Sequence, residues 1–308
     1  SPAAPCICRT LTNRKIRDYP ITVFQLCALQ KCSVTGIIRR LICLKKGGFA
    51  PDSQVDQMQL SIVMPAYNEE RRLAATLERY AGYFSGRYGP EAELIVVVNG
   101  STDGTADVAR ALAARLPIVR VMVDPRPIGK GGAIMKGFRA AAGNAVGFVD
   151  ADGSTAPEAF DDLVHILGDA GVIIASRWIA GAIVEPRQPL KRRVASRLFN
   201  ALVRILFAMK VRDTQCGAKL LSRAALDAVL PHLGVTRWAF DVDLLFQLHR
   251  MGYGIKEWPT VWRDAEGSRL RVIRASLEMF VAMVRLRLLY SPMRWVVGVY
   301  DATLGRWT

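Results

Sequence analysis

Two aspartates of this sequence are spaced as ligands of a divalent metal ion would be. Asp150 and Asp152 follow the apolar run 145–149, and side chains two residues apart on an extended chain point the same way. Mg²⁺ or Mn²⁺ accepts one or two such carboxylates and fills its other positions with phosphate oxygens and water. The alternative is a turn in which Asp152 or Ser154 caps the helix expected from Pro157. The position directly after a buried strand favours the metal site.

Three other polar, turn-prone segments also follow apolar runs. They are 65–70 (PAYNEE), 99–105 (NGSTDGT) and 126–132 (RPIGKGG). Backbone N–H groups at helix N-termini and the ammonium of Lys130 would attract phosphate. Together with a carboxylate pair, these groups suit a nucleotide diphosphate bound with a divalent cation.

Two common phosphate-binding motifs and a nucleophilic triad are not supported. Residues 129–132 have neither the spacing of a P-loop nor the glycine order of a dinucleotide fold, which argues against an ATPase or a dehydrogenase. A histidine-based triad is not expected either, because no histidine follows a predicted strand. The three histidines are His165, His232 and His249.

The elements that must position these segments are indicated by alternating apolar and amphipathic stretches. The apolar runs are 60–64, 92–98, 118–123 and 145–149, and the amphipathic stretches are 69–84, 103–116, 130–142 and 157–168. Such alternation is typical of β-α-β units with a parallel sheet buried on both faces. We therefore predict an α/β fold, with a Rossmann-like, doubly wound, mostly parallel sheet and helices on both faces. Ligands bind such sheets outside the carboxyl ends of the strands, where the polar segments should meet.

The two ends of the chain depart from this pattern. Residues 1–58 hold nine Lys or Arg against three Asp without a sustained period, and we predict a poorly ordered basic extension. Five of the six cysteines lie there at irregular spacings, which fits neither a disulfide framework nor a zinc site. The α/β domain is expected at 59–270, followed at 271–308 by an amphipathic helical segment. No clear transmembrane helix is expected, because charges interrupt every long apolar run.

The composition limits the class of partner. Hydrophobic residues make up 51% and charged residues 22%, a balance that excludes a disordered or low-complexity protein. The formal net charge of +15 points to phosphate-bearing partners, which include nucleotides, nucleic acids and anionic lipids. A non-catalytic binder of nucleic acid or membranes would not explain carboxylates at the strand ends, because they would repel a polyanion. We therefore expect no nucleic-acid partner.

A basic amphipathic helix is predicted over residues 190–209. The surrounding segment 187–223 carries ten Lys or Arg and one acid, Asp213, and the basic residues alternate with apolar ones at helical spacing. Such a helix can lie in the headgroup plane of an anionic membrane. The alternative is an ordinary surface helix that packs on the sheet with its charges in water. The stretch 271–290 repeats the pattern.

In this order, the segments resemble glycosyltransferase family 2 enzymes of GT-A fold. The resemblance is closest to the dolichyl-phosphate β-glucosyltransferases and the prokaryotic polyprenyl-phosphate glycosyltransferases, and it covers about residues 60–270. The motifs that carry it are PAYNEE at 65–70, NGSTDGT at 99–105, GKGGA at 129–133, DADGST at 150–155, SR at 176–177, RQP at 187–189, RDTQCGAKL at 212–220, WAFDVDLLF at 238–246 and WRDAEGSRL at 262–270.

The resemblance implies a nucleotide-sugar donor site that includes a metal ion. The donor-binding residues would be Pro65, Tyr67, Glu69, Asn99, Asp103, Lys130 and Asp150, with Mg²⁺ or Mn²⁺ on Asp150 and Asp152. Relatives usually carry an acidic pair where Asn99 stands, so the contact to the base would be made here by an amide, which can still pair with a uracil edge. The motifs RDTQCG and WAFDVD point to the glucosyl branch, which favours UDP-glucose over GDP-mannose.

The implied acceptor is a polyprenyl or dolichyl monophosphate at a membrane. Its second pKa lies near ~6, so the phosphate is already a nucleophile at neutral pH and needs no strong general base. The predicted reaction is an inverting hexose transfer that gives a β-linked lipid-phosphosugar. The catalytic residues would be Asp152, Asp241, Asp243 and Arg177, and the acceptor phosphate would be held by Arg187, Arg192, Arg193 and Arg263. For Asp241 and Asp243 the alternative is ordinary solvated charge on a helix.

Three other functions remain as alternatives. A GDP-mannose-dependent dolichyl-phosphate mannosyltransferase and a family 2 transferase with a sugar or small-molecule acceptor would share most of these motifs. A nucleotidyltransferase would share the sheet and the carboxylates but would carry a glycine- and arginine-rich signature where PAYNEE stands. We expect an enzyme associated with the cytoplasmic face of a membrane.

Overall fold

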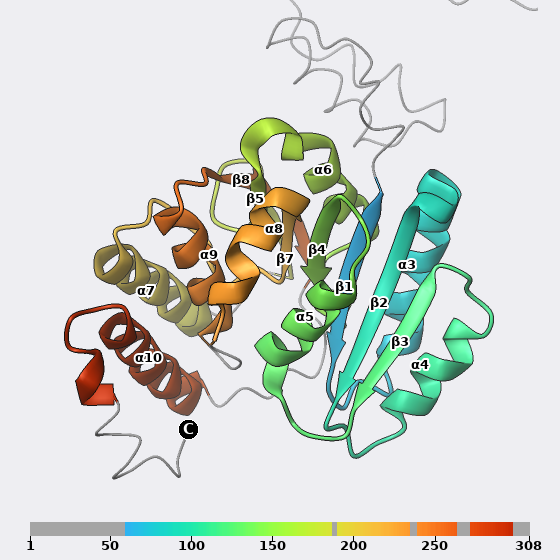
Figure 1. The fold of residues 1–308 in the computed structure, drawn as a ribbon, viewed down its shortest axis with the longest axis horizontal. Coiled ribbons are helices and arrows are strands. Elements are labelled where there is room, and N and C mark those ends of the chain that lie inside the picture. Colours follow the sequence, from blue (N-terminus) through green and yellow to red (C-terminus); the bar gives the residue numbers. More distant parts are fainter. Residues whose placement is uncertain (1–58, 187–189, 235–238, 264–271, 298–308) are drawn as a thin grey trace, which may run out of the picture. The chain divides into compact units, whose positions relative to one another are not determined.

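The computed structural model describes residues 59–186, 190–234, 239–263 and 272–297 (Figure 1). The basic extension predicted at 1–58 lies outside the described residues, as do the end of the expected α/β domain and residues 298–308. Within the described residues the chain forms a seven-stranded sheet of order β3-β2-β1-β4-β7-β5-β8 and a two-stranded sheet of β6 and β9. The predicted α/β fold is confirmed.

The main sheet is parallel except for one strand. Its strands are β1 (Leu60–Ala66), β2 (Ala92–Asn99), β3 (Val119–Asp124), β4 (Ala145–Val149), β5 (Val172–Ser176), β7 (Ala218–Ser222) and β8 (Ile255–Pro259), and the small sheet pairs β6 (Ile183–Glu185) with β9 (Val261–Arg263). β7 lies antiparallel between β4 and β5. The segment that leads into β7 therefore reaches the edge at which β4 and β5 end.

Helices cover both faces of the sheet. They are α3 (Leu73–Tyr88), α4 (Thr105–Ala113), α5 (Gly129–Ala140), α6 (Pro157–Leu167), α7 (Leu190–Phe207), α8 (Arg223–Val229), α9 (Phe240–Arg250) and α10 (Val272–Leu289). Short 3₁₀ turns follow α3, α6 and α8, at Gly89–Glu91, Gly168–Ala170 and Leu230–His232. Helices α3, α4 and α6 pack on one face, whereas α5, α8 and α9 pack on the other (Figure 1).

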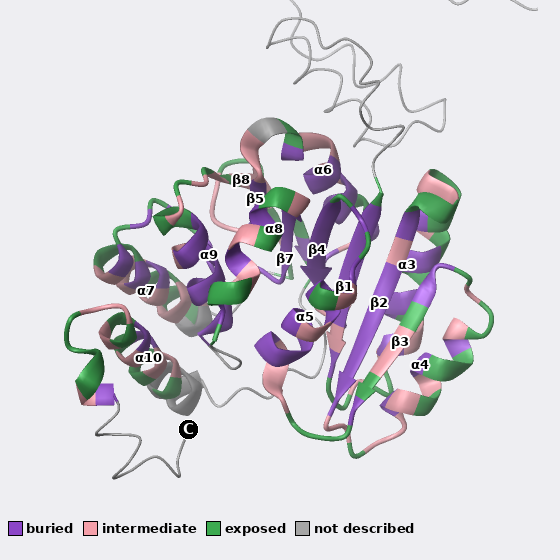
Figure 2. Ribbon diagram, in the orientation of Figure 1, coloured by how far each residue is buried: buried purple, intermediate pink, exposed green. Residues whose placement is uncertain are grey.

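Strand residues alternate between two hydrophobic cores. On β1, Ile62 and Met64 belong to the core under α3, whereas Val63 belongs to the core under α5 and α9. On β2, Leu94 and Ile95 divide in the same way, as the two-residue period of a strand requires. The central strands are buried on both faces, as Figure 2 shows for β1, β2 and β4, which explains why they read as continuous apolar runs. The edge strands β3 and β8 are partly exposed.

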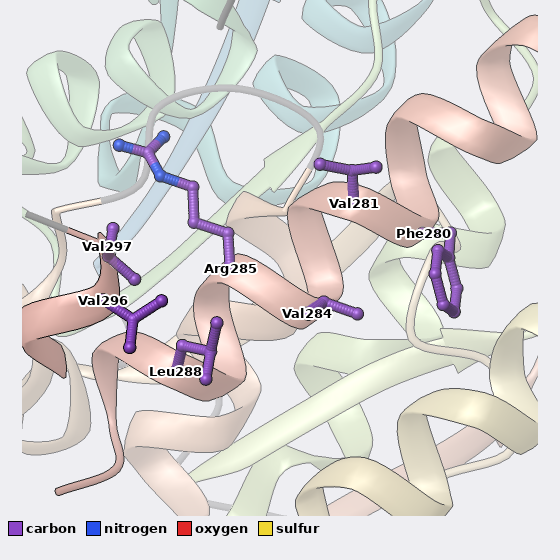
Figure 3. Close-up of a pocket in the computed structure, with 7 residues that line it drawn as sticks. All are labelled: Phe280, Val281, Val284, Arg285, Leu288, Val296 and Val297. Atoms are coloured by element: carbon purple, nitrogen blue, oxygen red, sulfur yellow. The ribbon is translucent and has the colours of Figure 1, made fainter. Parts of the chain in front are cut away.

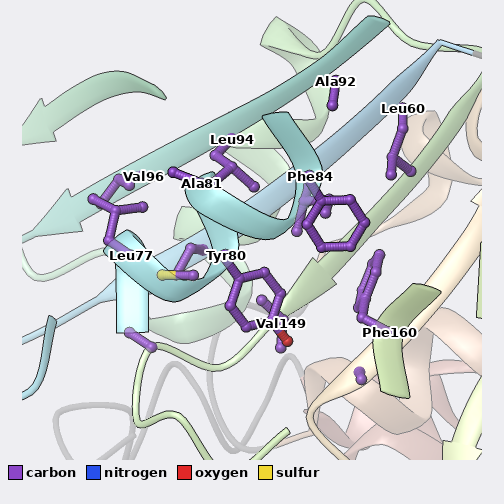
Figure 4. Packing of buried hydrophobic residues seen from close by; sticks show 14 of the residues in the cluster. Leu60, Leu77, Tyr80, Ala81, Phe84, Ala92, Leu94, Val96, Val149 and Phe160 are labelled. Carbon is purple, nitrogen blue, oxygen red and sulfur yellow. The ribbon is translucent and has the colours of Figure 1, made fainter. Parts of the chain in front are cut away.

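Helix α3 illustrates how a helical period builds one of these cores. Its buried side chains recur at Leu73, Leu77, Tyr80 and Phe84, which is the spacing of a single helix face. The Tyr80 and Phe84 rings stack with centroids 5.8 Å apart, and Figure 4 shows them packed beside Phe160 of α6. The Tyr80 hydroxyl donates a hydrogen bond of 2.9 Å to the carbonyl oxygen of Thr155. The core thereby holds the loop after β4 in place.

Helices α7 and α10 pack against each other at one side of the domain (Figure 1). Arg287 on α10 donates from Nε to the carbonyl oxygen of Leu206 on α7 at 2.9 Å. Both helices leave large apolar side chains exposed; with the turn after α10, these residues form what we term the α7–α10 surface. It comprises Leu190, Val194, Leu198, Ile205, Phe280, Val281, Val284, Leu289, Met293 and Trp295. In the part of the chain that the structure describes, no helix has the length and apolar character that crossing a membrane requires.

Candidate active site

The polar segments meet at what we term the carboxyl edge, the rim of the main sheet where β1 to β5 end and β7 begins (Figure 1). The reversed direction of β7 adds its leading segment to this rim. Asp150, just after β4, donates its backbone N–H to the carbonyl oxygen of Gly217, just before β7, at 3.2 Å. The loops after β1, β2, β3 and β4 and the start of β7 thus meet at the carboxyl edge.

The loops after β1 and β2 are joined into one unit by hydrogen bonds. The side-chain oxygen of Asn68 accepts from the backbone N–H of Thr102 at 2.9 Å, and the backbone N–H of Asn68 donates to the Ser101 hydroxyl at 3.1 Å. The backbone N–H of Glu69 donates to the Thr105 hydroxyl at 2.8 Å. Segments 65–70 and 99–105, both predicted to bind the donor, are therefore held together before any ligand arrives.

Asp103 and Asn99 are themselves partners in this unit. The Asp103 carboxylate accepts from the backbone N–H and hydroxyl of Thr105 and from the backbone N–H of Glu70. Burial raises the pKa of Asp103, but these hydrogen bonds outweigh it and lower the pKa below its ordinary value. Asn99 is 3% exposed and donates from Nδ2 to the carbonyl oxygen of Ala66 at 3.3 Å. Each is thus fixed in place by the loops it belongs to.

Pro65 and Tyr67 flank the end of β1. Pro65 is half-buried and pairs in register with Val97 of β2. Tyr67 follows β1 with 54% of its surface exposed. Its ring is therefore accessible to a ligand at the carboxyl edge.

The loop after β3 packs directly on the loop after β2. Gly100 has a φ of +58°, and a Cβ at this position would lie 2.7 Å from Cα of Pro127, so glycine is required twice over. Its backbone N–H donates to the carbonyl oxygen of Asp124 at 2.8 Å. Hydrogen bonds from Arg126 and Lys136 hold the pKa of the Asp124 carboxyl at about 2.

Four charges of alternating sign connect the end of β4 with α9, and we term them the ion-pair chain. Lys130 Nζ lies 2.7 Å from Asp150 Oδ1 and 3.8 Å from Asp241 Oδ2. Lys219 Nζ lies 2.5 Å from Asp241 Oδ1. Both ammonium groups also face the ring of Phe148, at 5.6 Å and 5.1 Å from its centroid. The residues come from α5, the loop after β4, α9 and β7, so the fold alone brings them together.

The ion-pair chain sets the protonation of its members. Burial and the neighbouring Asp152 carboxylate raise the pKa of Asp150 although Lys130 opposes them. Burial also raises the pKa of Asp241, but Lys130 and Lys219 outweigh it and the net shift is downward. For Lys130, burial lowers the pKa, whereas Asp150 and Asp241 raise it further, so the side chain is a cation. The electrostatic environment of Asp150 therefore favours the binding of a cation.

Asp152 takes part in a turn after β4, but neither Asp152 nor Ser154 caps α6, because the N-cap is Ala156 and no side chain bonds there. In this turn, Asp152 Oδ1 accepts from the backbone N–H of Ser154 at 2.9 Å. Asp152 follows β4 by three residues and so belongs to the loop at the carboxyl edge, where its charge adds to the rise in the pKa values of Asp150 and Glu69. The turn uses Oδ1 of Asp152, so a ligand role for Oδ2 is compatible with it.

Glu69 is the third carboxylate of this group. It is paired through both oxygens with Arg72, at 2.8 and 2.9 Å. Burial raises its pKa; Arg72 opposes this, and Asp152 and Asp150 add to it. Three acids thus gather at the ends of β1 and β4.

These carboxylates fit a divalent cation whose shell is completed by a ligand. Within the described residues no group of three or more His, Cys, Asp or Glu could hold a metal by itself. Oxygen donors from Asp150 and Asp152 suit Mg²⁺ or Mn²⁺, which commonly take one or two protein carboxylates and diphosphate oxygens. A Cβ on Gly217 would lie 2.0 Å from Asp150 Oδ2, so this glycine leaves the space that the carboxylate occupies.

Arg177 is anchored on Asp213, a residue that the sequence analysis did not single out for the site. Arg177 Nε and Nη2 donate to the two Asp213 oxygens at 2.8 and 2.9 Å, and the guanidinium lies 5.4 Å from the Trp262 ring. Asp213 is fully buried, and its backbone N–H donates to Glu257 at 3.1 Å. Burial lowers the pKa of Arg177, but Asp213 and the nearby Asp150 raise it. Arg177 is thus a fixed cation beside the ion-pair chain.

The structure separates the two predicted acids of α9. Residues two apart on a helix point in nearly opposite directions, because each residue turns by about 100°. Asp241 belongs to the ion-pair chain, whereas Asp243 is fully buried and accepts from the Tyr290 hydroxyl of α10 at 2.6 Å. Neither acid is solvated. Asp241 therefore lies among the charges at the carboxyl edge, whereas Asp243 forms a contact between α9 and α10.

The arginines predicted to hold an acceptor phosphate do not form one visible cluster. Arg263 ends β9, is exposed, and donates its backbone N–H to the carbonyl oxygen of Ser154 at 2.9 Å, which puts it beside the loop after β4. Arg193 is half-buried on α7. Arg187 lies outside the described residues, and Arg192 belongs to α7 without a described side chain.

Sequence reasoning passed over Lys219, Asp213 and Gly217. All three fall in the motif RDTQCGAKL at 212–220, which contributes to the family resemblance and to the charge of segment 187–223 but was not predicted to be part of the site. A lysine within the apolar run Ala218–Ser222 was the available signal, because buried lysines are almost always paired. The reversal of β7, which brings these residues to the carboxyl edge, left no mark in the sequence pattern.

Comparison with known proteins places this site in a family. A profile described as glycosyl transferase family 2 matches residues 61–230. The chain is 33% identical over 255 residues to dolichyl-phosphate β-glucosyltransferase of Mus musculus, covering 77% of each chain. It is 29% identical over 255 residues to the protein of that name from Dictyostelium discoideum, covering 79% of this chain and 78% of the relative.

Solved structures support the fold. Glucosyl-3-phosphoglycerate synthase from Mycobacterium tuberculosis, in complex with Mn²⁺, UDP-glucose and phosphoglyceric acid, aligns with a TM-score of 0.60 at 21% identity. The alignment covers 78% of this chain and 84% of that protein. The resemblance stated from the motifs is therefore confirmed at the level of family and fold.

Proposed function

The chain belongs to glycosyl transferase family 2, and from this premise we propose that it transfers glucose from UDP-glucose to a dolichyl or polyprenyl phosphate at a membrane surface. The observation that carries the proposal is the joint occurrence of the carboxyl-edge acids and the ion-pair chain in a chain that matches dolichyl-phosphate β-glucosyltransferases over most of its length. The product is a β-linked lipid-phosphoglucose.

The donor is held by the joined loops after β1 and β2. Tyr67 offers an exposed ring to the uracil. Asn99 lies where the same loops leave the sheet, at the end of β2. Pro65, Glu69 and Asp103 maintain the shape of this unit through the contacts described above.

The leaving diphosphate needs positive charge. Lys130 is a cation with 36% of its side chain exposed, so it can reach a ligand oxygen while it remains near Asp150. Asp150 and Asp152 would hold Mg²⁺ or Mn²⁺, which supplies charge neutralisation for the diphosphate. Arg177 adds a fixed charge whose orientation Asp213 sets.

The acceptor phosphate provides the nucleophile. Its oxygen attacks C1 of glucose, the bond from C1 to the UDP oxygen breaks with its electron pair on UDP, and the anomeric configuration inverts. A phosphate monoester is ionised at neutral pH, so no residue has to remove a proton from it. Asp241 presents one carboxylate oxygen to the glucose hydroxyls, and Arg263, beside the loop after β4, binds the incoming phosphate with Arg187, Arg192 and Arg193.

The lipid part of the acceptor requires a surface that can enter a membrane interface. In the α7–α10 surface, Leu190, Leu198 and Ile205 are 72%, 66% and 79% exposed, and α7 also carries Arg193 and Arg204. Apolar and basic side chains on one helix pair favour the headgroup plane of an anionic leaflet. We assign this surface to the cytoplasmic leaflet, whose negative potential attracts basic residues.

A pocket along α10 offers a place for part of the isoprenoid chain. Figure 3 shows Val284, Leu288, Val296 and Val297 around it, together with the side chain of Arg285. Phe280 and Val281 complete the lining. An apolar groove on the membrane-facing side is the contact that a long hydrocarbon chain would favour.

The proposal is tested with the purified full chain, dolichyl phosphate in detergent micelles, and either UDP-glucose or GDP-mannose. We expect a lipid-phosphoglucose only with UDP-glucose, dependence on Mg²⁺ or Mn²⁺, and a β-anomeric signal by NMR. Transfer from GDP-mannose and not from UDP-glucose would show that the donor is GDP-mannose. Transfer to a free sugar or small phosphorylated acid, with none to dolichyl phosphate, would overturn the acceptor assignment.

A further inference from the structure

Lys219 is a charged residue buried in a central strand, where burial of an ammonium group is energetically unfavourable. It is 0% exposed in β7, between two neighbouring strands, and its partners in register are Phe148 of β4 and Ile174 of β5. A buried ammonium loses its hydration, and proteins tolerate it only where partners compensate. The side chain must therefore serve something that an apolar residue could not.

The ammonium of Lys219 is fully engaged by the protein. It donates to Asp241 Oδ1 at 2.5 Å and to the carbonyl oxygen of Cys216 at 2.7 Å, and it lies 5.1 Å from the centroid of the Phe148 ring. With no exposed surface, it cannot touch a substrate. Whatever Lys219 contributes to the reaction passes through Asp241.

Asp241 has two unequal oxygens as a result. Oδ1 is fixed by Lys219, while Oδ2 lies 3.8 Å from Lys130, which in turn contacts Asp150 at 2.7 Å. The Asp241 side chain is 6% exposed and belongs to the first turn of α9, where the backbone N–H groups favour a carboxylate. Without Lys219 the carboxylate would be free to rotate toward Lys130 with either oxygen.

We infer that Lys219 is a positioning residue, which locks one oxygen of Asp241 so that the other faces Lys130 and the glucose of the donor. The inference rests on the role proposed above for Asp241. A rival explanation is that Lys219 only compensates the buried charge of Asp241 and so stabilises the fold. The two explanations differ in what happens to turnover once folding is restored.

The test compares Lys219→Met, Asp241→Asn and the double variant Lys219→Met/Asp241→Asn in the full chain. Thermal melting, UDP affinity in the presence of Mn²⁺, and kcat and KM for both substrates are measured well below each melting temperature. Lys256→Met provides the control, because Lys256 is exposed on β8.

We expect Lys219→Met to lower kcat by about a hundredfold, the loss typical of a reacting group displaced by about 1 Å, with UDP affinity changed less than about threefold. The double variant should melt higher than Lys219→Met, because no unpaired charge is left buried, yet have the kcat of Asp241→Asn within about twofold. A folded Lys219→Met that keeps more than about a third of wild-type kcat would show a purely structural role.

A second comparison tests the route through Asp241 if Lys219→Met does not fold. The neutral double variant is then set against Asp241→Asn alone, and the inference requires equal kcat values. A further tenfold loss in the double variant overturns it, because Lys219 would then act by a route independent of Asp241. Failure of the proposed function is recognised separately, since wild-type protein would then make no lipid-phosphoglucose at all.

Discussion

The carboxyl edge and the α7–α10 surface belong to one domain but are built in opposite ways. At the carboxyl edge, short loops are joined by hydrogen bonds, and each predicted donor-binding acid already has a polar partner. On the α7–α10 surface, large apolar side chains face water on long helices. Under the proposed function, small charged ligands would meet a preformed site, whereas the lipid would meet a surface that becomes buried only when it binds.

The largest effect that tests this contrast is expected from Asp152→Asn. The amide keeps the shape and can still accept from Ser154, but it removes the charge that would bind Mg²⁺ or Mn²⁺. We expect less than about a tenth of wild-type turnover at saturating Mn²⁺, as the metal-binding role requires. Turnover assays and circular dichroism melts check it, and normal turnover in a folded variant would remove Asp152 from the metal site.

A large effect is also expected from Gly217→Ala. The new Cβ would meet Asp150 Oδ2 at 2.0 Å, so the carboxylate must turn away, and we expect kcat/KM for the donor to fall by about ten- to a hundredfold. Gly234→Ala is the matched control, because a Cβ there meets no atom within 4 Å. Equal kinetics of the two variants would show that the rigid packing of the carboxyl edge is unimportant for catalysis.

The double variant Leu198→Ser/Ile205→Ser tests the α7–α10 surface. Both side chains are largely exposed, so the folded protein loses little, whereas each contributes about 1.5–3 kcal/mol if a membrane buries it fully. We expect at least about tenfold weaker sedimentation with anionic liposomes and a higher KM for lipid phosphate, with unchanged UDP affinity. Val123→Ser, an exposed apolar side chain on β3, serves as the control. Unchanged liposome binding would show that α7 is an ordinary surface helix that does not bind the membrane.

The smallest effect is expected from Asn99→Asp. The substitution replaces the amide that donates to Ala66 with a buried carboxylate, which disturbs the loop that holds the base. We expect the donor KM to rise by about three- to tenfold, which corresponds to about 1 kcal/mol, while the Mn²⁺ requirement stays the same. Activity is measured while both substrates and Mn²⁺ are titrated separately. A change in the Mn²⁺ requirement alone, with the donor KM unaltered, would show that Asn99 contacts the metal rather than the donor.

Local periodicity predicted the donor half of the fold well. The expected runs 60–64, 92–98, 118–123 and 145–149 lie within β1 to β4 or differ from them by a residue or two. Each of these strands is followed by its own helix, so local pattern and global fold agree. The polar segments after them meet at one edge, as parallel strands require.

Other features depended on long-range packing and could not be read from the sequence. Nothing in Ala218–Ser222 indicates that β7 runs backwards between β4 and β5, yet this reversal brings Gly217 to Asp150 and Lys219 to Asp241. Asp241 and Asp243 look alike in sequence, and only the contacts of α9 with β7 and α10 distinguish them.

The reversal of β7 also has a consequence for how the protein is made. A ribosome delivers the chain from its N-terminus, so the strands β1 to β4 and the loops after β1, β2 and β3 are all synthesised before residue 150. Their neighbour β7 emerges about seventy residues later and must enter beside β4, a pairing between distant segments that forms slowly. Asp241, still further along, reaches Lys130 last. The nascent chain therefore acquires the loops after β1 to β3 first, and the ion-pair chain can form only after α9 has been synthesised.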